Sequence, residues 1–456
     1  MLYREALNYL YAQLPMFQRV GPAAYKKDLG NTLALCAYLG NPHTKFKSVH
    51  IAGTNGKGSV SHMLAAACQT AGLKTGLYVS PHYKDFRERI KIDGQYISRK
   101  QVVDFVEKHR AKIEEIQPSF FELCVAMAFD HFAQEQVDIA IVEVGLGGRL
   151  DSTNIITPLL SVITNISYDH QNMLGDTLPL IAGEKAGIIK PGIPVVIGET
   201  HPESAPVFLK KAAETGSEIV FADQQFELTE SSPPNWKTAH FSVLKQGQLY
   251  LEKLDVDAAG PFLQSNVTTA LQAWEWLALP VRAGYMEGKG DQGLGNARLR
   301  QGFGGQAKLE IFQSGLKSLK SRTRFIGRWQ LIGQKPTVLC DSAHNEAGLR
   351  TTLDAIKSAP FSRLHFVIGF VNDKSVDPVL ALFPPTARYY FAKANIPRGL
   401  DATALREKAA SLDLPGRAYS SVKSALQAAK RAATPEDLII VTGSIFVVAE
   451  VLPAPE

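Results

Sequence analysis

Paired cysteines, long apolar runs and clusters of like charge are all missing from this chain. Its four cysteines, Cys36, Cys68, Cys124 and Cys340, form no C-x-x-C pair and lie in apolar stretches, so we interpret them as buried, reduced thiols. No run of about 18 apolar residues occurs, and the N-terminal stretch MLYREALNYLYAQL does not read as a signal peptide. We therefore expect a cytoplasmic protein without a membrane partner.

Charge of one sign is also scarce. The 456 residues include 49 Lys and Arg against 44 Asp and Glu, a formal net charge of +5, and the basic residues are scattered rather than clustered. This distribution does not predict nucleic-acid binding. With 45% hydrophobic and 20% charged residues, the composition is that of a globular protein, and the length exceeds that of one ordinary domain.

Apolar strands alternate with helices along most of the chain. Residues 1–47 are expected to be mostly helical, and from Ser48 onward a pattern of strand, loop and helix repeats. Expected strands lie at 48–53, 75–80, 137–145, 159–166, 194–199 and 217–222, and expected helices at 58–72, 120–134 and 177–189. Near-continuous apolar strands between helices predict a parallel sheet covered on both faces.

The alternation resumes in a second, smaller α/β unit. Its expected strands are 337–344, 363–370, 388–394 and 438–444, and its expected helices are 346–358 and 421–433. We predict two domains, residues 1–315 and 323–456, joined by a linker at 316–322. Within the first, the Gly-, Gln- and Arg-rich stretch 282–308 has little apolar content and is expected to be a surface insertion. An RNA-binding Gly/Arg segment is the alternative.

The stretch IAGTNGKGSV, residues 51–60, raises the question of function. Its glycines follow an apolar strand and open a helix, where backbone amides converge on a phosphate. Lys57 would add a positive charge for the terminal phosphates, and Ser59 would offer a hydroxyl to Mg²⁺. Yet the usual phosphate loop has four residues between its first glycine and Gly-Lys, whereas two stand here.

Polar residues follow several of the expected strands. Glu143 ends one strand, Asp169 and His170 follow the next, and Asp341 and His344 end the first strand of the second unit. Because open α/β sheets bind ligands at the carboxyl ends of their strands, these residues predict a site in the cleft between the two units. Lys185 lies inside an apolar helix, where a bare ammonium needs a partner or a modification.

Taken together, these motifs resemble the folylpolyglutamate synthase/dihydrofolate synthase family of the Mur ligase superfamily. The resemblance rests on AGTNGKGS, SPHYKDFRERIKIDG, VEVGLGGRLDSTN, DHQNMLGDTLPLIAGEKAGIIKPG, GRWQ, DSAHNEAG and TGSIFVVAE. It covers nearly the whole chain outside 282–308, and the shortened loop is the form found in this superfamily. It implies a large N-terminal P-loop ATPase domain with a parallel sheet and a smaller C-terminal Rossmann-like α/β domain.

The resemblance also implies site residues. Those that would bind ATP are Gly53, Thr54, Asn55, Gly56, Lys57, Gly58, Ser59, Asn266, Arg328 and Asp341. Those that would bind two Mg²⁺ ions are Ser59, Glu143, His170 and Lys185, the lysine as a carbamate. Those that would act in catalysis are Lys57, Glu143, Lys185 and His344, and those near the folate substrate are Ser80, His82, Phe86, Arg89 and Asp151. A monovalent cation is a further implied cofactor.

The implied reaction joins L-glutamate to a carboxylate of dihydropteroate or of a reduced folate. ATP would phosphorylate the carboxylate, the glutamate amine would attack the acyl phosphate, and ADP and phosphate would leave. The sequence departs from the family on the adenine side, where the pattern G-x-[HY]-Q-x-x-N is filled by Gly260, Phe262, Leu263 and Asn266, so Leu263 replaces the glutamine. The insertion at 282–308 is also not a family feature.

Two other functions remain as alternatives. A cell-wall amino-acid ligase would carry a separate domain before the ATP domain, and only about 50 residues precede the loop here. A non-catalytic nucleotide-binding protein could share the fold, although it would not need the whole set of polar residues. The sequence does not choose between the two acceptors, and a monomer is the default expectation.

Overall fold

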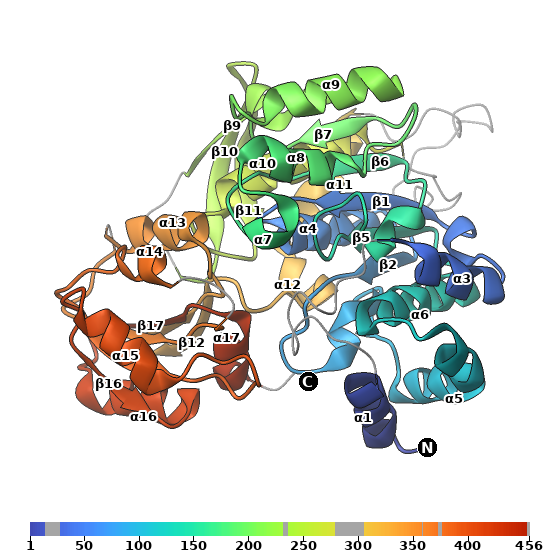
Figure 1. Cartoon of the computed structure of the whole chain (residues 1–456). Helices are drawn as coiled ribbons and strands as arrows, with labels where there is room; N and C mark the ends of the chain where they lie inside the picture. Colours follow the sequence, from blue (N-terminus) through green and yellow to red (C-terminus); the bar gives the residue numbers. More distant parts are fainter. Residues whose placement is uncertain (14–27, 231–235, 279–304, 358, 373–375, 454–456) are drawn as a thin grey trace.

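The computed structural model describes residues 1–13, 28–230, 236–278, 305–357, 359–372 and 376–453. In this part of the chain, three sheets and their helices form two units (Figure 1). The α/β class expected from the sequence is confirmed, with a large, mostly parallel sheet in the N-terminal half and a second sheet in the C-terminal half.

The large sheet has eight strands in the order β4-β3-β2-β5-β1-β6-β7-β8. Their bounds are β1 Lys47–Ala52, β2 Thr75–Tyr78, β3 Ile90–Ile92, β4 Gln95–Tyr96, β5 Ile139–Glu143, β6 Leu160–Ile163, β7 Val195–Ile197 and β8 Ile219–Phe221. The central strands pair in parallel, and only β3 and β4 at one edge are antiparallel. The central strands β5 and β6 are buried throughout, as near-continuous apolar runs require.

Helices cover both faces of this sheet. Helix α4, Lys57–Thr70, packs on one face with α10, Leu263–Trp276, and α11, Gly305–Lys317. Helices α5, Arg99–Ile116, and α6, Phe120–Gln134, cover the other face. The remaining helices of this half are α1 Tyr3–Gln13, α3 Gly30–Tyr38, α7 Gln171–Leu174, α8 Leu178–Ala186, α9 Ala205–Thr215 and α12 Leu319–Thr323. The turn between β1 and α4 thereby lies at the carboxyl end of a central strand.

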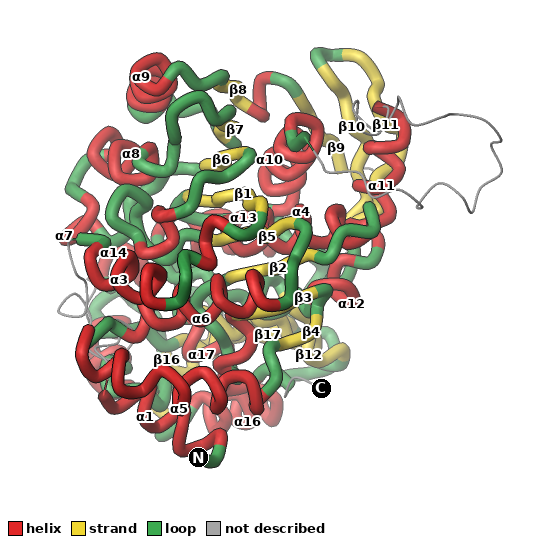
Figure 2. Tube along the Cα trace, turned by 90° about the vertical axis from the view of Figure 1, so that its right-hand side faces the viewer, coloured by secondary structure: helices red, strands yellow, loops and turns green. Residues whose placement is uncertain are grey.

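A three-stranded antiparallel sheet was not expected from the sequence. It comprises β9 Phe226–Glu230, β10 Ala239–Lys245 and β11 Gln248–Val256 in the order β11-β10-β9. Figure 2 shows it at the margin of the large sheet, beside α11. Along β9 and β10, buried residues alternate with more exposed ones, so one face joins the core around α4 and α10. Strands of this kind carry a weaker apolar signal than fully buried parallel strands.

The C-terminal sheet has six strands in the order β12-β13-β17-β14-β15-β16. They are β12 Gln330–Gln334, β13 Thr337–Cys340, β14 Leu364–Ile368, β15 Arg388–Ala392, β16 Gly416–Tyr419 and β17 Leu438–Thr442. Only β12 is antiparallel. The helices are α13 Glu346–Lys357, α14 Asp377–Leu380, α15 Ala402–Ala410, α16 Val422–Ala432 and α17 Ile445–Val451. Helices α13 to α15 pack on one face and α16 and α17 on the other.

The region between the two units contains helices α11 and α12. Helix α12 overlaps the segment 316–322 that we assigned as a linker and ends one residue beyond it, and it packs on α4. Residues 305–308 of the expected insertion begin α11, where the Lys308 ammonium donates to the carbonyls of Trp274, Glu275 and Leu277. Residues 282–304 lie outside the described part of the chain. The predicted domain boundaries remain predictions.

Two further expectations concern the whole chain. All four cysteines are buried and free, which confirms that they are not paired in disulfides. Among the described helices, none combines the length and the apolar character that crossing a bilayer would need.

Candidate active site between the two domains

The phosphate-loop candidate, residues 53–59, connects β1 to α4 as expected. Gly53 has φ of 145°, and a Cβ there would lie 1.8 Å from Oγ1 of Thr164. Gly56 has φ of 85°, and a Cβ there would lie 2.2 Å from Oδ1 of Asn266. Both positions therefore require glycine for two reasons, the backbone conformation and the lack of space. The structure places Asn266 directly against the loop.

Two lysines converge on one carbonyl of this loop. Lys57 Nζ donates to the Gly53 and Thr54 carbonyls at 3.0 and 3.1 Å, and Lys185 Nζ donates to the Gly53 carbonyl at 2.9 Å. Burial, together with the Lys57 charge, lowers the pKa of Lys185 from 10.5 to about 7. Burial also lowers the pKa of Lys57, although Glu143 and Asp169 oppose this shift. The buried lysine predicted in α8 thus has a partner, a backbone oxygen of the loop.

Glu143 ends β5 and faces the start of α4. A Cβ at Gly58 would lie 3.6 Å from Oε2 of Glu143, and the same oxygen accepts the backbone N–H of Ser80 at 3.1 Å. The residue is only 4% exposed, and burial raises the pKa of its carboxyl from 4.5 to about 7, despite the nearby Lys57. Ser59, also buried, follows Gly58 on α4. The structure therefore brings Ser80, which the resemblance had assigned to the folate substrate, together with Ser59 and Glu143, which it had assigned to Mg²⁺.

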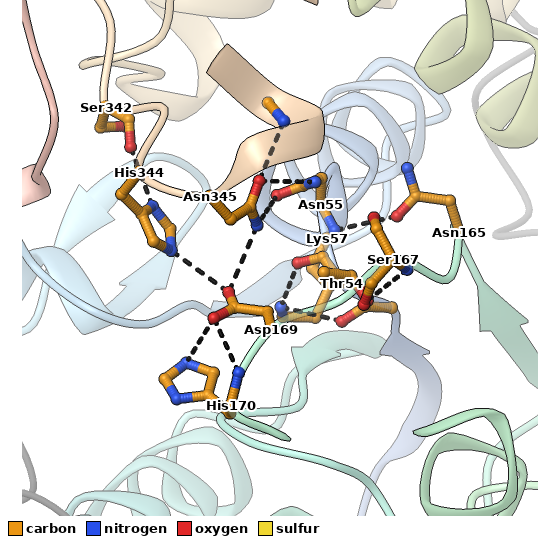
Figure 3. Close-up of polar contacts among 12 residues, drawn as sticks. Thr54, Asn55, Lys57, Asn165, Ser167, Asp169, His170, Ser342, His344 and Asn345 are labelled. Atoms are coloured by element: carbon orange, nitrogen blue, oxygen red, sulfur yellow. Dashed lines mark hydrogen bonds and ion pairs between the residues drawn. The ribbon is translucent and has the colours of Figure 1, made fainter. Parts of the chain in front are cut away.

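Residues after β6 and β13 meet across the cleft (Figure 3). The Asp169 carboxylate lies 3.3 Å from Nε2 of His344 and also accepts a 3.3 Å hydrogen bond from the amide of Asn345. His344 Nδ1 faces the Ser342 carbonyl at 3.0 Å. His170 Nε2 lies 3.7 Å from the other oxygen of Asp169. The expected clustering of strand-end residues from both sheets is therefore present.

Arg328 and Asp341 hold the chain where it enters the C-terminal sheet. Asp341 is 2% exposed and accepts the backbone N–H groups of Trp329 and Ala343, each at 2.9 Å. Arg328 donates to the Ser342 hydroxyl. Tyr83, from the N-terminal domain, donates its hydroxyl to the Gly327 carbonyl at 3.1 Å. Both carboxylate oxygens of Asp341 thus bind backbone, so its direct role here is to fix this turn.

Three of the residues expected near the folate, His82, Phe86 and Arg89, form one aromatic and basic cluster. Arg89 Nε donates to Nδ1 of His82 at 2.8 Å, and the Arg89 guanidinium lies 5.2 Å from the ring centroid of Phe120. His82 also packs on Tyr11, while Phe86 is only 1% exposed and contacts both His82 and Phe120. Phe86 is therefore part of the core, and it supports this cluster from behind.

Asp151 lies apart from that cluster, in the loop after β5. Its carboxylate accepts the backbone N–H of Leu146 at 2.9 Å and both the backbone N–H and the hydroxyl of Thr153. It therefore shapes the glycine-rich loop that follows Glu143. Leu263, which replaces the family glutamine, begins α10 and is completely buried in the core. Because its side chain is apolar, it offers no hydrogen bond to a base.

The candidate metal ligands do not form a closed cage. Among the described residues, no three His, Cys, Asp or Glu side chains gather as a metal site by themselves. Mg²⁺ usually takes one or two protein carboxylates and completes its shell with water and substrate phosphates. A buried Glu143 beside Ser59 at the start of a phosphate-loop helix fits that pattern.

Two cavities open near the domain boundary. The smaller, ≈ 70 Å³, is lined by Ser59, Glu143, Ser80 and Arg328 among others. The larger, ≈ 570 Å³, has walls that include Trp236 and Trp329, whose ring centroids are 5.9 Å apart. Sequence reasoning did not find these two tryptophans, nor the roles of Tyr83 and Asn345. Trp329, Tyr83 and Asn345 stand inside the quoted motifs GRWQ, SPHYKDFRERIKIDG and DSAHNEAG, which was the available signal, whereas Trp236 stands in none of them.

Comparisons with known proteins agree with this arrangement. Residues 51–274 match the Mur ligase middle domain, and residues 327–445 match the Mur ligase glutamate ligase domain. Folylpolyglutamate synthase of Lacticaseibacillus casei is 31% identical over 99% of this chain and 98% of its own length. Dihydrofolate synthase/folylpolyglutamate synthase of Bacillus subtilis is 30% identical over 98% of both chains.

Solved structures give the same picture. Folylpolyglutamate synthase of Mycobacterium tuberculosis, solved with ADP and AMPPCP, superimposes with a TM-score of 0.82 at 29% identity and full coverage of both chains. FolC of Escherichia coli, solved with DHPP and ADP, gives a TM-score of 0.80 at 27% identity over 99% of this chain and 97% of that one.

The fold and the two matched domains define a Mur-type, ATP-dependent ligase. Within that class, the chain belongs to the folylpolyglutamate synthase/dihydrofolate synthase family. The resemblance found in the sequence motifs is thereby confirmed, and the protein is an enzyme.

Proposed function

We propose that this protein uses ATP to join L-glutamate to a folate-type carboxylate, releasing ADP and phosphate. The observation that carries the proposal is that polar groups of both domains surround the phosphate loop. Lys185 donates to the Gly53 carbonyl of the loop, and Asn345 and His344 of the other domain contact Asn55 of the loop and Asp169 beside it. A nucleotide-binding module would not need charged groups from both domains around one loop. A ligase must hold ATP and its acceptor and must then exclude water.

In this proposal, the ATP phosphates lie along the loop amides of residues 53–59. Lys57, now bonded to two loop carbonyls, turns to the terminal phosphates when they arrive. The smaller cavity beside Ser59 and Glu143 gives the reacting groups their place. Asn266 and Arg328 approach the nucleotide from the two domains, and Asp341 keeps the turn that carries Arg328 in position.

Glu143 with Ser59 would hold one Mg²⁺, and His170 with Lys185 a second. When bound, Mg²⁺ would neutralise the negative charge that develops on the phosphate during its transfer. Near pH 7 the Lys185 amine is partly neutral, and the neutral amine is the form that adds CO₂ to become a carbamate. Carbamylation would replace a cation beside Lys57 with an anion, which removes a repulsion in a buried place. A monovalent cation belongs to the same proposal.

The acceptor carboxylate attacks the γ-phosphate of ATP, which forms an acyl phosphate and releases ADP. In this proposal Lys57 neutralises charge on the transferring group, and His344, which contacts Asp169, acts at the same phosphate. The glutamate amine then attacks the acyl carbon, and phosphate leaves. The cluster of Arg89, His82 and Tyr11 would offer one cation and aromatic faces for the pterin end, with Ser80 on the loop just before His82. Asp151 would act from the separate loop after β5.

Dihydropteroate and a reduced folate are both candidate acceptors, and the enzyme is proposed to act as a monomer in the cytoplasm. ADP release by the purified protein with Mg²⁺, ATP and L-glutamate tests the function. The assay is run with dihydropteroate, with tetrahydrofolate and with neither. Acceptor-dependent release supports the proposal and names the acceptor. ATP binding without any acceptor-dependent release would refute it.

A Glu143→Ala variant separates an enzyme from a binding protein. In a ligase, loss of this carboxylate lowers the turnover rate by at least about 100-fold, because the negative charge on the transferring phosphate is no longer stabilised. In a protein that only binds nucleotide, the same change alters nucleotide affinity and nothing else.

A further inference from the structure

One set of side chains joins the two domains directly above the phosphate loop. Asn55 and Asn345 exchange amide hydrogen bonds, with Asn345 Nδ2 to Asn55 Oδ1 at 3.1 Å and Asn55 Nδ2 to Asn345 Oδ1 at 3.4 Å. The Asp169 carboxylate receives Asn345 Nδ2 and lies against His344 Nε2, each at 3.3 Å. We name Asn55, Asp169, His344 and Asn345 the latch (Figure 3).

Each member of the latch is held in place by a second hydrogen bond within its own domain. The backbone N–H of Asn55 donates to Asn165 Oδ1 at 2.9 Å. The Asp169 carboxylate accepts the backbone N–H of His170 at 2.8 Å. His344 Nδ1 faces the Ser342 carbonyl at 3.0 Å, and Asn345 Oδ1 accepts the backbone N–H of Gly348 at 2.9 Å. The two halves are therefore ordered before they meet, which lowers the entropy cost of closing.

The centre of the latch is shielded from water. Asn345 is 6% exposed and the Asp169 side chain 10%, whereas His344 is 34% exposed and Asn55 is half-buried. Hydrogen bonds to a charged group are stronger than neutral ones, and burial strengthens them further. Because Asn55 belongs to the phosphate loop itself, opening the latch uncovers the place where the γ-phosphate would be transferred.

We propose that Asp169 is a positioning residue which, with the Asn55–Asn345 pair, keeps the domains closed while the acyl phosphate exists. This inference rests on the proposed function. In the closed enzyme the glutamate amine attacks the acyl carbon, the C–O bond to phosphate breaks, and an amide and phosphate form. In an open enzyme water attacks instead, which regenerates the carboxylate and releases phosphate. Each such event consumes one ATP without forming an amide.

The ratio of ADP released to amide formed therefore reports on the latch. In the wild-type enzyme the ratio is expected to be close to one. Asp169→Ala removes the acceptor of His344 and Asn345, and the ratio should rise to about two or more as water competes with the amine. Asp169→Asn keeps the size and an oxygen acceptor and should give a value in between. Asp176→Ala, an exposed carboxylate seven positions along the chain, is the matched control and should stay at one.

A second variant avoids reliance on Asp169 alone. Asn345→Ser retains an oxygen that caps the start of α13 through the Gly348 N–H, but its side chain is too short to reach Asn55 and Asp169. Its ratio should also rise above one, with an unfolding midpoint like that of the wild type. If Asp169→Ala does not fold or does not turn over, this variant decides the outcome.

The possible outcomes distinguish a failure of the proposed function from a failure of the latch. If the wild type makes no amide with either acceptor, the proposed function is wrong. If the wild type ligates and both Asp169→Ala and Asn345→Ser keep a ratio of one, even with slower turnover, the latch does not control water and the inference is overturned.

Discussion

Glu143→Gln should change how the stability of the free protein depends on pH. The carboxyl of Glu143 is 4% exposed, and its burial raises the pKa to about 7. Glutamine has nearly the same shape and keeps an oxygen for the Ser80 amide, so packing around the residue is preserved. The substitution therefore removes one titration and leaves the local structure in place.

The sign of the effect follows from the direction of the pKa shift. With a pKa of 4.5 unfolded and about 7 folded, the folded protein binds more protons between these values. The stabilisation linked to Glu143 is therefore complete below pH 4.5 and is lost as the pH rises through 7. Between pH 5 and pH 8.5 the wild type should lose about 2.5 kcal/mol that the variant does not lose.

Urea denaturation of the metal-free protein at pH 5 and pH 8.5 measures this difference. The free energy of unfolding of Glu143→Gln, relative to the wild type, should be about 2.5 kcal/mol higher at pH 8.5 than at pH 5. Glu252→Gln changes an exposed glutamate and serves as the control, with an expected change within about 0.5 kcal/mol at both values. Parallel pH profiles for the wild type and Glu143→Gln would show that the carboxyl is ionised in the folded protein, and would refute the reasoning.

Three further changes test other parts of the site. Lys185→Met should raise the free energy of unfolding of the free protein by about 1–3 kcal/mol at pH 6 and should remove turnover. The reason is that the pKa of Lys185 is lowered in the folded protein, so the full cost of burying its charge is present below pH 7. Urea denaturation that shows no stabilisation at pH 6, or a larger stabilisation at pH 10 than at pH 6, would contradict this. Gly56→Ala should weaken ATP binding at least about tenfold in calorimetry, since the alanine Cβ would meet Asn266 and the backbone at this position has a positive φ. An unchanged affinity for ATP would mean that the loop rearranges freely. Leu263→Gln, which restores the family residue, should lower the free energy of unfolding by about 1–3 kcal/mol, because it buries an amide in an apolar core. An unchanged free energy of unfolding in urea denaturation would show that the amide finds a hydrogen-bond partner.

The central part of the fold was predictable because its signals are local. The strand ending at Glu143 contains the apolar run 139–142, and the strand ending at Ala52 is mostly apolar toward its end and leads directly into Gly53. Such runs fit only a strand buried on both faces. The antiparallel strands β9 to β11 were missed because their apolar pattern is weaker than a continuous run, although Gly247 marks the turn between β10 and β11.

The site was predictable as a set of residues but not as a set of contacts. That a lysine inside α8 needs a partner follows from the cost of burying an ammonium. That the partner is the carbonyl of Gly53, 132 positions away, is a property of the folded chain. The pairing of Asn55 with Asn345 joins residues 290 positions apart, and no local pattern reports such a contact. The tryptophans of the larger cavity are likewise brought together only by folding.

The central claim is that ATP activates a folate-type carboxylate in the cleft between the two domains, before glutamate reacts with it. The most direct test uses dihydropteroate or tetrahydrofolate whose reacting carboxylate carries ¹⁸O at both oxygens, with ATP, Mg²⁺ and L-glutamate, and measures the mass of the phosphate released. The account predicts that each phosphate carries one ¹⁸O atom, because that oxygen bridges carbon and phosphorus in the acyl phosphate. Amide formation with unlabelled phosphate would contradict it.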